Sequence, residues 1–207
     1  MLMAHRGLDW HYHMPWDFFG KAWDEAKPEV AFGELPVLVI DGTHMLWESA
    51  AILRYLADGT PLVPSDARAR ARADAILDST KRFVMPVDAT VNIRQGNRFE
   101  EEKAEALKKM PEMLAPFLRE LEQSGGPFFL GASPTICDFA FFHHLDMMLL
   151  LDTALCDQHS NLRHFHGAMM ALPGVYGYLS SRSPLTGMGT NPQIKINGVL
   201  TPTMAGR

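Results

Sequence analysis

The amino-acid sequence predicts a small α/β unit followed by an all-α unit. Two short apolar runs, residues 37–40 and 43–46, flank the dipeptide Asp41-Gly42, which is a strong signal for a tight β-hairpin. Over residues 66–181, apolar side chains instead recur at helical spacing. Residues 59–65, GTPLVPS, separate the two patterns and contain the glycine and prolines typical of a boundary. The change of period predicts two units of different fold class.

Three further elements are expected in the first unit. Residues 10–14, WHYHM, alternate ring-bearing and polar side chains, which predicts a short strand. Residues 17–27 have the pattern of one short helix that Pro28 ends. After Glu48 and Ser49, apolar side chains recur at helical spacing. The sequence therefore predicts that a helix follows the hairpin directly.

The second unit is expected to contain helices only. The segment Thr135-Ile136-Cys137-Asp138 is a capping-box variant, in which side chains satisfy backbone N–H groups at the start of a helix. Residues 125–127, Gly-Gly-Pro, end the helix that precedes it. The expected helices cover residues 66–92, 100–123, 135 to about 151, 161–172 and 174–181.

These elements divide the chain into four expected parts. The tail alternates apolar and polar residues near Ile194 and then offers Asn197-Gly198 as a turn. Its proline and glycine content predicts an exposed or loosely docked segment, and the alternative is that it adds a strand to the sheet of the first domain. The parts are a first domain of residues 1–58, a linker of residues 59–65, a helical domain of residues 66–188 and a tail of residues 189–207.

Composition excludes several classes of function. The net charge of −5 and the pI near 6.0 do not match a nucleic-acid-binding surface. Two cysteines in apolar surroundings suit reduced thiols, and no apolar run is long enough to cross a membrane, so we expect a cytoplasmic protein. No metal site is expected, because the histidine pairs are adjacent or alternate in sequence and do not share a helix face. These pairs are His11/His13, His143/His144 and His164/His166.

The order of several motifs resembles the cytosolic glutathione transferases. The motifs are FGELPVL, the aspartate-glycine hairpin, E-S-x-A-I-x-R-Y-L and T-x-x-D-F in the helical half. They are most similar to the sigma-like classes, which include the glutathione-dependent prostaglandin D synthases, and the resemblance extends from residue 1 to about residue 186. It implies a thioredoxin-like N-terminal domain, an all-helical C-terminal domain and a homodimer. It also implies glutathione as co-substrate, conjugated to a small apolar electrophile or used to isomerise one.

Glutathione has two carboxylates and one ammonium, so its site needs charged or polar groups at both ends. Glu48 and Ser49 stand at a predicted helix start, where free N–H groups and the helix dipole favour an anion. Ser49 adds a hydroxyl donor for the γ-glutamyl carboxylate, and Glu48, which only accepts hydrogen bonds, is expected to face the ammonium. The alternative is that Ser49 only caps the helix.

The other candidate residues hold the middle and the far end of the tripeptide. The N–H and C=O of Leu35 can pair with the cysteinyl portion as an added strand would, and the resemblance implies that Pro36 is cis. Trp23 and Lys27 are four residues apart, so they are expected to hold the glycyl carboxylate from one helix face. The alternatives are that Trp23 is a core aromatic, that Lys27 is solvated and that Pro36 only shapes the hairpin entry.

The sequence departs from the sigma-like pattern in charge. That pattern has glutamine at the position of Glu48, and it has an acidic residue on the first helix of the all-α half that reaches the ligand ammonium across the dimer. Here residues 78–82 read Asp-Ser-Thr-Lys-Arg, so a basic pair replaces the acid. One interpretation is that the acidic charge has moved from one subunit to the other.

A second departure concerns catalysis. In the family, a first strand and turn deliver the catalytic hydroxyl or thiol, and Met1 of this chain matches a position beyond them. No catalytic residue is therefore assigned, and we expect an N-terminally shortened form whose small domain is the weaker half and whose conjugating activity is low. The competing hypothesis is a non-catalytic family member, either a glutathione-binding scaffold or a structural protein of the crystallin kind.

Overall fold

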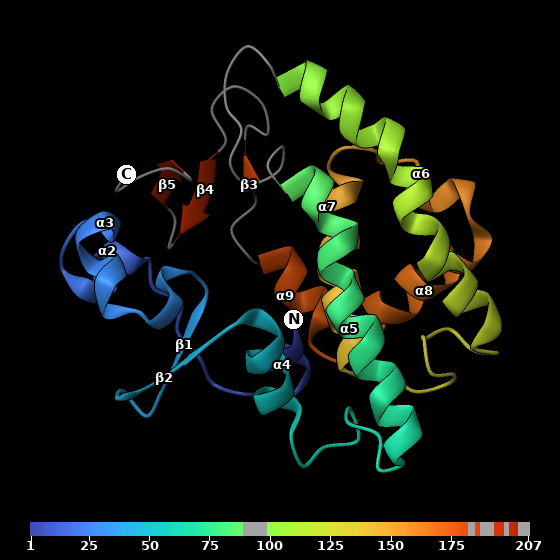
Figure 1. Ribbon diagram of the computed structural model, residues 1–207, viewed down its shortest axis with the longest axis horizontal. Coiled ribbons are helices and arrows are strands. Elements are labelled where there is room, and N and C mark those ends of the chain that lie inside the picture. The colour runs from blue at the N-terminus through green and yellow to red at the C-terminus, as the bar shows by residue number, and fades with distance from the viewer. Residues whose placement is uncertain (89–98, 182–184, 187–192, 197–198, 203–207) are drawn as a thin grey trace.

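Two kinds of architecture follow each other along the chain (Figure 1). The computed structural model describes residues 1–88, 99–181, 185–186, 193–196 and 199–202. Among these residues, no helix combines the length and the apolar character that crossing a membrane requires. The fold confirms the predicted class, a small sheet with short helices followed by a helical half.

The N-terminal part is built from short elements. The predicted strand at residues 10–14 is wrong, because the chain between α1 and α2 forms neither helix nor strand. In the described residues β1 pairs with β2 alone, so residues 10–14 have no strand beside them to accept their backbone hydrogen bonds. The elements are α1 (Leu2–His5), α2 (Pro15–Phe19), α3 (Trp23–Ala26), η1 (Lys27–Glu29), η2 (Ala31–Gly33), β1 (Val37–Ile40), β2 (His44–Trp47) and α4 (Ser49–Ala57).

The helix predicted over residues 17–27 is divided in two. Gly20 follows α2 with φ 66 and ψ 19, the left-handed conformation that ends a helix. The chain enters helical conformation again at Trp23, and the Lys27 N–H then bonds the Trp23 carbonyl oxygen one turn later. The predicted adjacency of Trp23 and Lys27 therefore holds over a single turn.

The hairpin is antiparallel and precedes α4, as predicted. Val37 pairs with Trp47 and Ile40 with His44, which leaves a three-residue loop in place of the expected two-residue turn. Asp41 and Gly42 both have positive φ, of 51 and 73, in this loop. Strand β2 begins one residue later than expected because the loop includes Thr43.

The helical half contains every helix that the sequence predicts. The first of them ends at Asp88, and residues 89–92 of the prediction lie outside the described residues. Helix α7 is the centre of this half, with nine of its 14 residues buried, and it packs against α5 and α8. The elements are α5 (Ala67–Asp88), α6 (Phe99–Gln123), α7 (Ile136–Leu149), η4 (Leu155–Gln158), α8 (Ser160–Met170) and α9 (Val175–Ser181).

The capping box predicted before α7 is present. The carboxylate of Asp138 accepts a hydrogen bond from the Thr135 N–H at 2.7 Å and from the Thr135 hydroxyl at 2.9 Å. Its other oxygen accepts the Phe129 N–H at 2.9 Å. Burial raises the pKa of Asp138 to about 6, although these hydrogen bonds act in the opposite direction. One buried carboxylate thus joins the start of α7 to the preceding loop.

Strands form in the described residues of the tail. β4 (Gln193–Ile196) pairs with β5 (Val199–Pro202), and β3 (Leu185–Thr186), just before the tail, pairs with β4, which gives an antiparallel sheet in the order β3, β4, β5. The loose docking expected for the tail stays a prediction. This sheet is separate from β1 and β2, so the alternative of a strand added to the first sheet is wrong. Alternating residues in β4 and the turn signal at Asn197-Gly198 are consistent with the pairing of β4 with β5.

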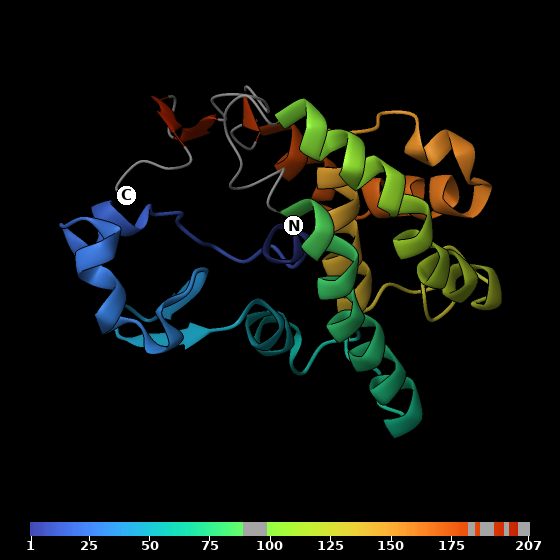
Figure 2. The same ribbon diagram turned by 45° about the horizontal axis from the view of Figure 1, so that its top comes forward.

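Helix α4 connects the two halves. It lies between the β1–β2 hairpin and the helices α5 and α7 (Figures 1 and 2). Ala57 at its end is fully buried, and the carbonyl oxygen of Leu62 beyond it accepts a hydrogen bond at 3.1 Å from the Ile136 N–H at the start of α7. Arg54 bonds Asp74 at 2.7 Å and Asp78 at 3.0 Å on α5. These contacts hold the C-terminal end of α4 against α5 and α7.

Candidate functional site

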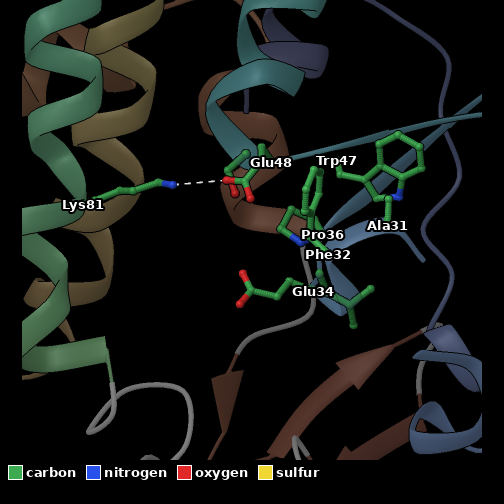
Figure 3. A pocket seen from close by; sticks show the side chains of 9 residues that line it. Ala31, Phe32, Glu34, Pro36, Trp47, Glu48 and Lys81 are labelled. Carbon is green, nitrogen blue, oxygen red and sulfur yellow. Dashed lines mark hydrogen bonds and ion pairs between the residues drawn. The ribbon is translucent and has the colours of Figure 1, made fainter. Parts of the chain in front are cut away.

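A cavity of about 170 Å³ lies between the loop before β1, the junction of β2 with α4, and helix α5 (Figure 3). It brings together four of the six residues that the sequence predicts for the site, namely Leu35, Pro36, Glu48 and Ser49. The other two, Trp23 and Lys27, are not part of its lining. The lining residues are Ala31, Phe32, Glu34, Leu35, Pro36, Trp47, Glu48, Ser49 and Lys81.

The segment before β1 presents its main chain to this cavity. The peptide bond between Leu35 and Pro36 is cis, as the resemblance implies. Leu35 precedes the hairpin, and neither its N–H nor its C=O bonds another described residue. A main chain with free donors and acceptors can pair with an extended peptide. This is the geometry that the backbone contact predicted for Leu35 requires.

Glu48 stands at the junction of β2 and α4 in a strained conformation. Its φ of 66 and ψ of 114 are rare for a residue with a side chain, and such strain gathers at functional sites. It is the N-cap residue of α4 and its carbonyl oxygen accepts the Ile52 N–H at 2.9 Å, but no side chain bonds the helix start. Ser49 is the first residue of the helix, so the alternative that Ser49 acts only as the cap is wrong. Within the described residues, the Ser49 hydroxyl has no hydrogen-bond partner.

Lys81 is a pocket residue that the sequence analysis did not assign. It extends from α5 toward Glu48, and its Nζ lies 3.2 Å from Oε2 of Glu48 (Figure 3). Both side chains remain about half exposed, at 61% for Lys81 and 46% for Glu48. The available signal was the basic pair at residues 81–82, but the sequence alone does not show that α5 of the same chain faces the start of α4.

The structure places Lys27 beside the pocket. A Cβ at Gly33, where φ is +58, would lie 3.1 Å from Cε of Lys27, so the lysine stem crosses the backbone of this glycine. Gly33 separates the pocket residues Phe32 and Glu34, which places the lysine stem next to the pocket rim. Trp23 is half-buried one turn before Lys27.

An aromatic pair forms the wall on the hairpin side. Phe32 is 77% exposed and has φ 64, and its ring meets the Trp47 indole edge-to-face at 6.5 Å. The indole nitrogen of Trp47 is buried and has no hydrogen-bond partner among the described residues. These residues were missed because the meeting of the Phe32 and Trp47 side chains depends on tertiary contacts rather than on sequence period.

The charges of the cavity suit a ligand that carries both signs. Two carboxylates, Glu34 and Glu48, stand against one ammonium, Lys81, and the Ser49 hydroxyl and the first turn of α4 add donors. Ser49 carries the one hydroxyl among the lining residues, which include no tyrosine or cysteine.

Other places in the molecule offer less. A second cavity of about 170 Å³ is lined by both Arg54 and Arg70, but Arg54 is already paired with Asp74 and Asp78. Burial raises the pKa of both the Cys137 and the Cys156 thiols, that of Cys156 to about 11, which disfavours the reactive thiolate. No group of three or more metal-ligating side chains occurs in the described ranges.

Comparison with known proteins gives two family matches. The family model described as "Glutathione S-transferase, N-terminal domain" matches residues 1–58, and the one described as "Glutathione S-transferase, C-terminal domain" matches residues 88–182. Both descriptions refer to one family, and together the matches cover most of the chain.

Individual relatives and structures agree with these matches. The chain is 35% identical over 152 residues to "Glutathione S-transferase Mu 1" of Oryctolagus cuniculus, which covers 72% of this chain and 66% of that protein. It is 29% identical over 186 residues to "Hematopoietic prostaglandin D synthase" of Gallus gallus, with 87% of each covered. The solved glutathione S-transferase of Ascaris lumbricoides superposes with a TM-score of 0.74 at 24% identity, covering 88% of this chain and 89% of that one.

Proposed function

Because this chain belongs to the glutathione S-transferase family, we propose that it binds glutathione in the cavity between Leu35, Ser49 and Lys81. The family uses glutathione as its co-substrate. The reaction that we propose is transfer of the glutathione thiol to a small apolar electrophile, or isomerisation of such a compound. The observation that carries the proposal is the convergence of a free Leu35 main chain and the start of α4 on one cavity.

The tripeptide is proposed to lie along the cavity with its γ-glutamyl end at α4. Ser49 and the first N–H groups of the helix hold the γ-glutamyl carboxylate, because the hydroxyl and these N–H groups all donate hydrogen bonds at the start of the helix. Leu35 pairs with the cysteinyl portion, and Pro36 shapes its main chain for this contact. Lys27, beside the rim, and Trp23 bind the glycyl carboxylate at the far end.

A calorimetric titration tests this proposal with a matched pair of peptides. Glutathione and its isomer with an ordinary α-peptide bond between Glu and Cys have the same charges and the same atoms. The proposed mode depends on the γ-linkage, because this linkage places the α-amino-acid group at α4 while the cysteine pairs with Leu35. We expect saturable binding of glutathione and much weaker binding of the isomer. No binding of glutathione, or equal binding of the two peptides, would refute the proposed mode.

A non-catalytic role is the second candidate function. The residues that line the cavity favour this role. Among the described lining residues Ser49 carries the one hydroxyl, and the proposed binding mode already uses it for the γ-glutamyl end. A glutathione-binding or crystallin-like structural member needs no thiol-activating donor. Measuring conjugation of glutathione to 1-chloro-2,4-dinitrobenzene separates the two candidates. Turnover well above the uncatalysed rate supports the transferase, and glutathione binding without turnover supports the non-catalytic member.

The arrangement of domains and subunits is proposed with this function. We propose a glutathione-binding domain over residues 1–58, a linker over 59–65, a helical domain over 66–188 and a tail from 189, acting as a cytoplasmic homodimer. The absence of helix and strand between Ala57 and Ala67 supports the linker. Sedimentation analysis of the purified chain tests the homodimer.

A further inference from the structure

We propose that Lys81 determines which ligands this pocket accepts, by exchanging its partner when a ligand binds. In the free protein its ammonium is paired with Glu48. In the complex the Lys81 ammonium contacts the α-carboxylate of the ligand, and Glu48 receives the α-ammonium. The inference rests on the proposed function, since it names the residue that recognises the γ-glutamyl end of glutathione.

The two residues face each other across the cavity. Glu48 belongs to the start of α4 and Lys81 to the middle of α5, and the ion pair between them bridges these elements (Figure 3). An ion pair this exposed contributes only about 0–1 kcal/mol, so separating it costs little. A zwitterionic ligand replaces both partners at once and leaves neither charge alone.

The balance of charge in the pocket favours such a ligand. Figure 3 shows that the carboxylates of Glu34 and Glu48 both point toward the side from which Lys81 enters. Two carboxylates facing one ammonium leave the lining with one negative charge in excess. The ammonium of an α-amino-acid group compensates this excess, and its carboxylate lies between Lys81 and the Ser49 hydroxyl.

Neighbouring charges leave Lys81 available for this role. The nearest acid on its own helix is Asp78, one turn earlier, and Arg54 already bonds that carboxylate at 3.0 Å. Glu48 is therefore the partner that Lys81 has in the free protein, and the start of α4 is the place where it meets a ligand. All these groups come from one chain.

The test compares Lys81→Met with the control Lys108→Met, which changes an exposed lysine of α6 that does not line the pocket. Methionine keeps the apolar stem of lysine and removes the charge. Calorimetry measures three ligands: glutathione, an analogue without the α-carboxylate (4-aminobutyryl-cysteinyl-glycine) and an analogue without the α-amino group (glutaryl-cysteinyl-glycine). Thermal unfolding of each variant verifies that it is folded.

We expect Lys81→Met to weaken binding of glutathione and of the glutaryl analogue by about tenfold to a hundredfold, the usual effect of losing a hydrogen bond to a charged group. Binding of the 4-aminobutyryl analogue should be the same in the wild type and in Lys81→Met, because that ligand has no carboxylate for Lys81. Lys108→Met should match the wild type with all three ligands.

Two results would overturn the assignment of Lys81 and leave the proposed function intact. One is unchanged glutathione affinity in Lys81→Met, and the other is an equal loss for glutathione and for the 4-aminobutyryl analogue. In both cases the wild type still binds glutathione and the proposed function stands. If the wild type itself does not bind glutathione, the proposed function fails and this inference fails with it.

Discussion

Ser49 is the residue at which ligand binding and helix stability can be separated. It is the first residue of α4, while the N-cap position belongs to Glu48 and no side chain bonds the helix start. Replacing Ser49 by alanine should therefore leave the free energy of unfolding unchanged within about 0.5 kcal/mol, as for an ordinary surface substitution. The same change removes a donor to a charged group and should weaken glutathione binding by about 1.5–3 kcal/mol.

Calorimetry and chemical denaturation on Ser49→Ala measure these two quantities independently. Ser65→Ala, in the exposed segment before α5, is the matched control and should change neither. Unchanged glutathione affinity in Ser49→Ala would remove the γ-glutamyl end from the start of α4. A loss of stability without a loss of affinity would mean that Ser49 serves the helix alone.

Asp138 is the residue on which the start of α7 depends. Its two oxygens accept hydrogen bonds from Phe129 and Thr135 while the residue is fully buried. Asparagine replaces one acceptor oxygen by a donor group, so Asp138→Asn should lower the free energy of unfolding by about 1–3 kcal/mol. Urea denaturation at pH 7.5 measures this loss.

Comparing the wild type with Asp138→Asn also gives a prediction for how stability depends on pH. Burial raises the pKa of Asp138 from its ordinary 3.8 to about 6 in the folded state. A raised pKa means that the folded state binds the proton more tightly, so this group stabilises the protein fully below about pH 4 and loses that contribution as pH rises through 6. From pH 7.5 to pH 5, the stability difference between wild type and Asp138→Asn should widen by about 1–2 kcal/mol. A constant or narrowing difference would contradict the raised pKa.

At the scale of elements, the docking of α1 against the start of α9 depends on one glycine. Gly174 has φ +75, and a Cβ there would lie 2.3 Å from the carbonyl oxygen of Ala4. Gly174→Ala should destabilise the protein by about 1–3 kcal/mol, because the backbone is strained and α1 must move.

Gly177, inside α9, is the control for this change. A Cβ at Gly177 meets nothing within 4 Å, so Gly177→Ala should be neutral or stabilise by up to about 1 kcal/mol. Thermal denaturation compares the two variants. Equal effects at both positions would show that the contact between Gly174 and α1 is absent in solution.

Long helices and strong local signals could be predicted from the sequence, whereas short elements that depend on a tertiary partner could not. Helices α5, α6 and α8 each carry an apolar stripe over several turns, and α7 is a long apolar segment that is buried on most sides. The Asp41-Gly42 turn and the Thr135–Asp138 capping box are local signals that need no tertiary partner. The strand expected at residues 10–14 depended on a neighbouring strand, which the described sheet does not provide. The break at Gly20 was missed because a single glycine is also tolerated within a helix.

The candidate site shows the same division. Leu35, Pro36, Glu48 and Ser49 follow each other around the hairpin, so their convergence on one cavity follows from local geometry. Lys81 enters from another helix, and its place depends on how α5 packs against α4, which the sequence period does not specify.

At the scale of the whole molecule, burial is unevenly distributed. One continuous core extends from Leu2 and Ala57 through α5 to α9, whereas none of the residues in β1 and β2 is fully buried. The aromatic centre of the core includes Phe117 stacked on Phe141 at 4.8 Å. The hairpin that forms one wall of the pocket therefore belongs to the less stable part of the molecule.

Hydrogen exchange measures this difference. Amides in α7 should exchange through global unfolding, and amides in β1 and β2 should exchange faster, through local opening. Saturating glutathione should slow exchange in the hairpin more than in α7, because the ligand binds only when the hairpin is formed. Equal protection of α7 and the hairpin in the free protein would contradict the uneven core.

The location of bound glutathione is the most direct test of the account. Backbone amide shifts in a ¹⁵N-labelled sample, followed during titration with glutathione, report which residues the ligand contacts. The account predicts saturable changes that are largest at the amides of Glu34, Leu35 and Ser49. Changes centred on the second cavity around Arg54 and Arg70, or no changes at all, would contradict it.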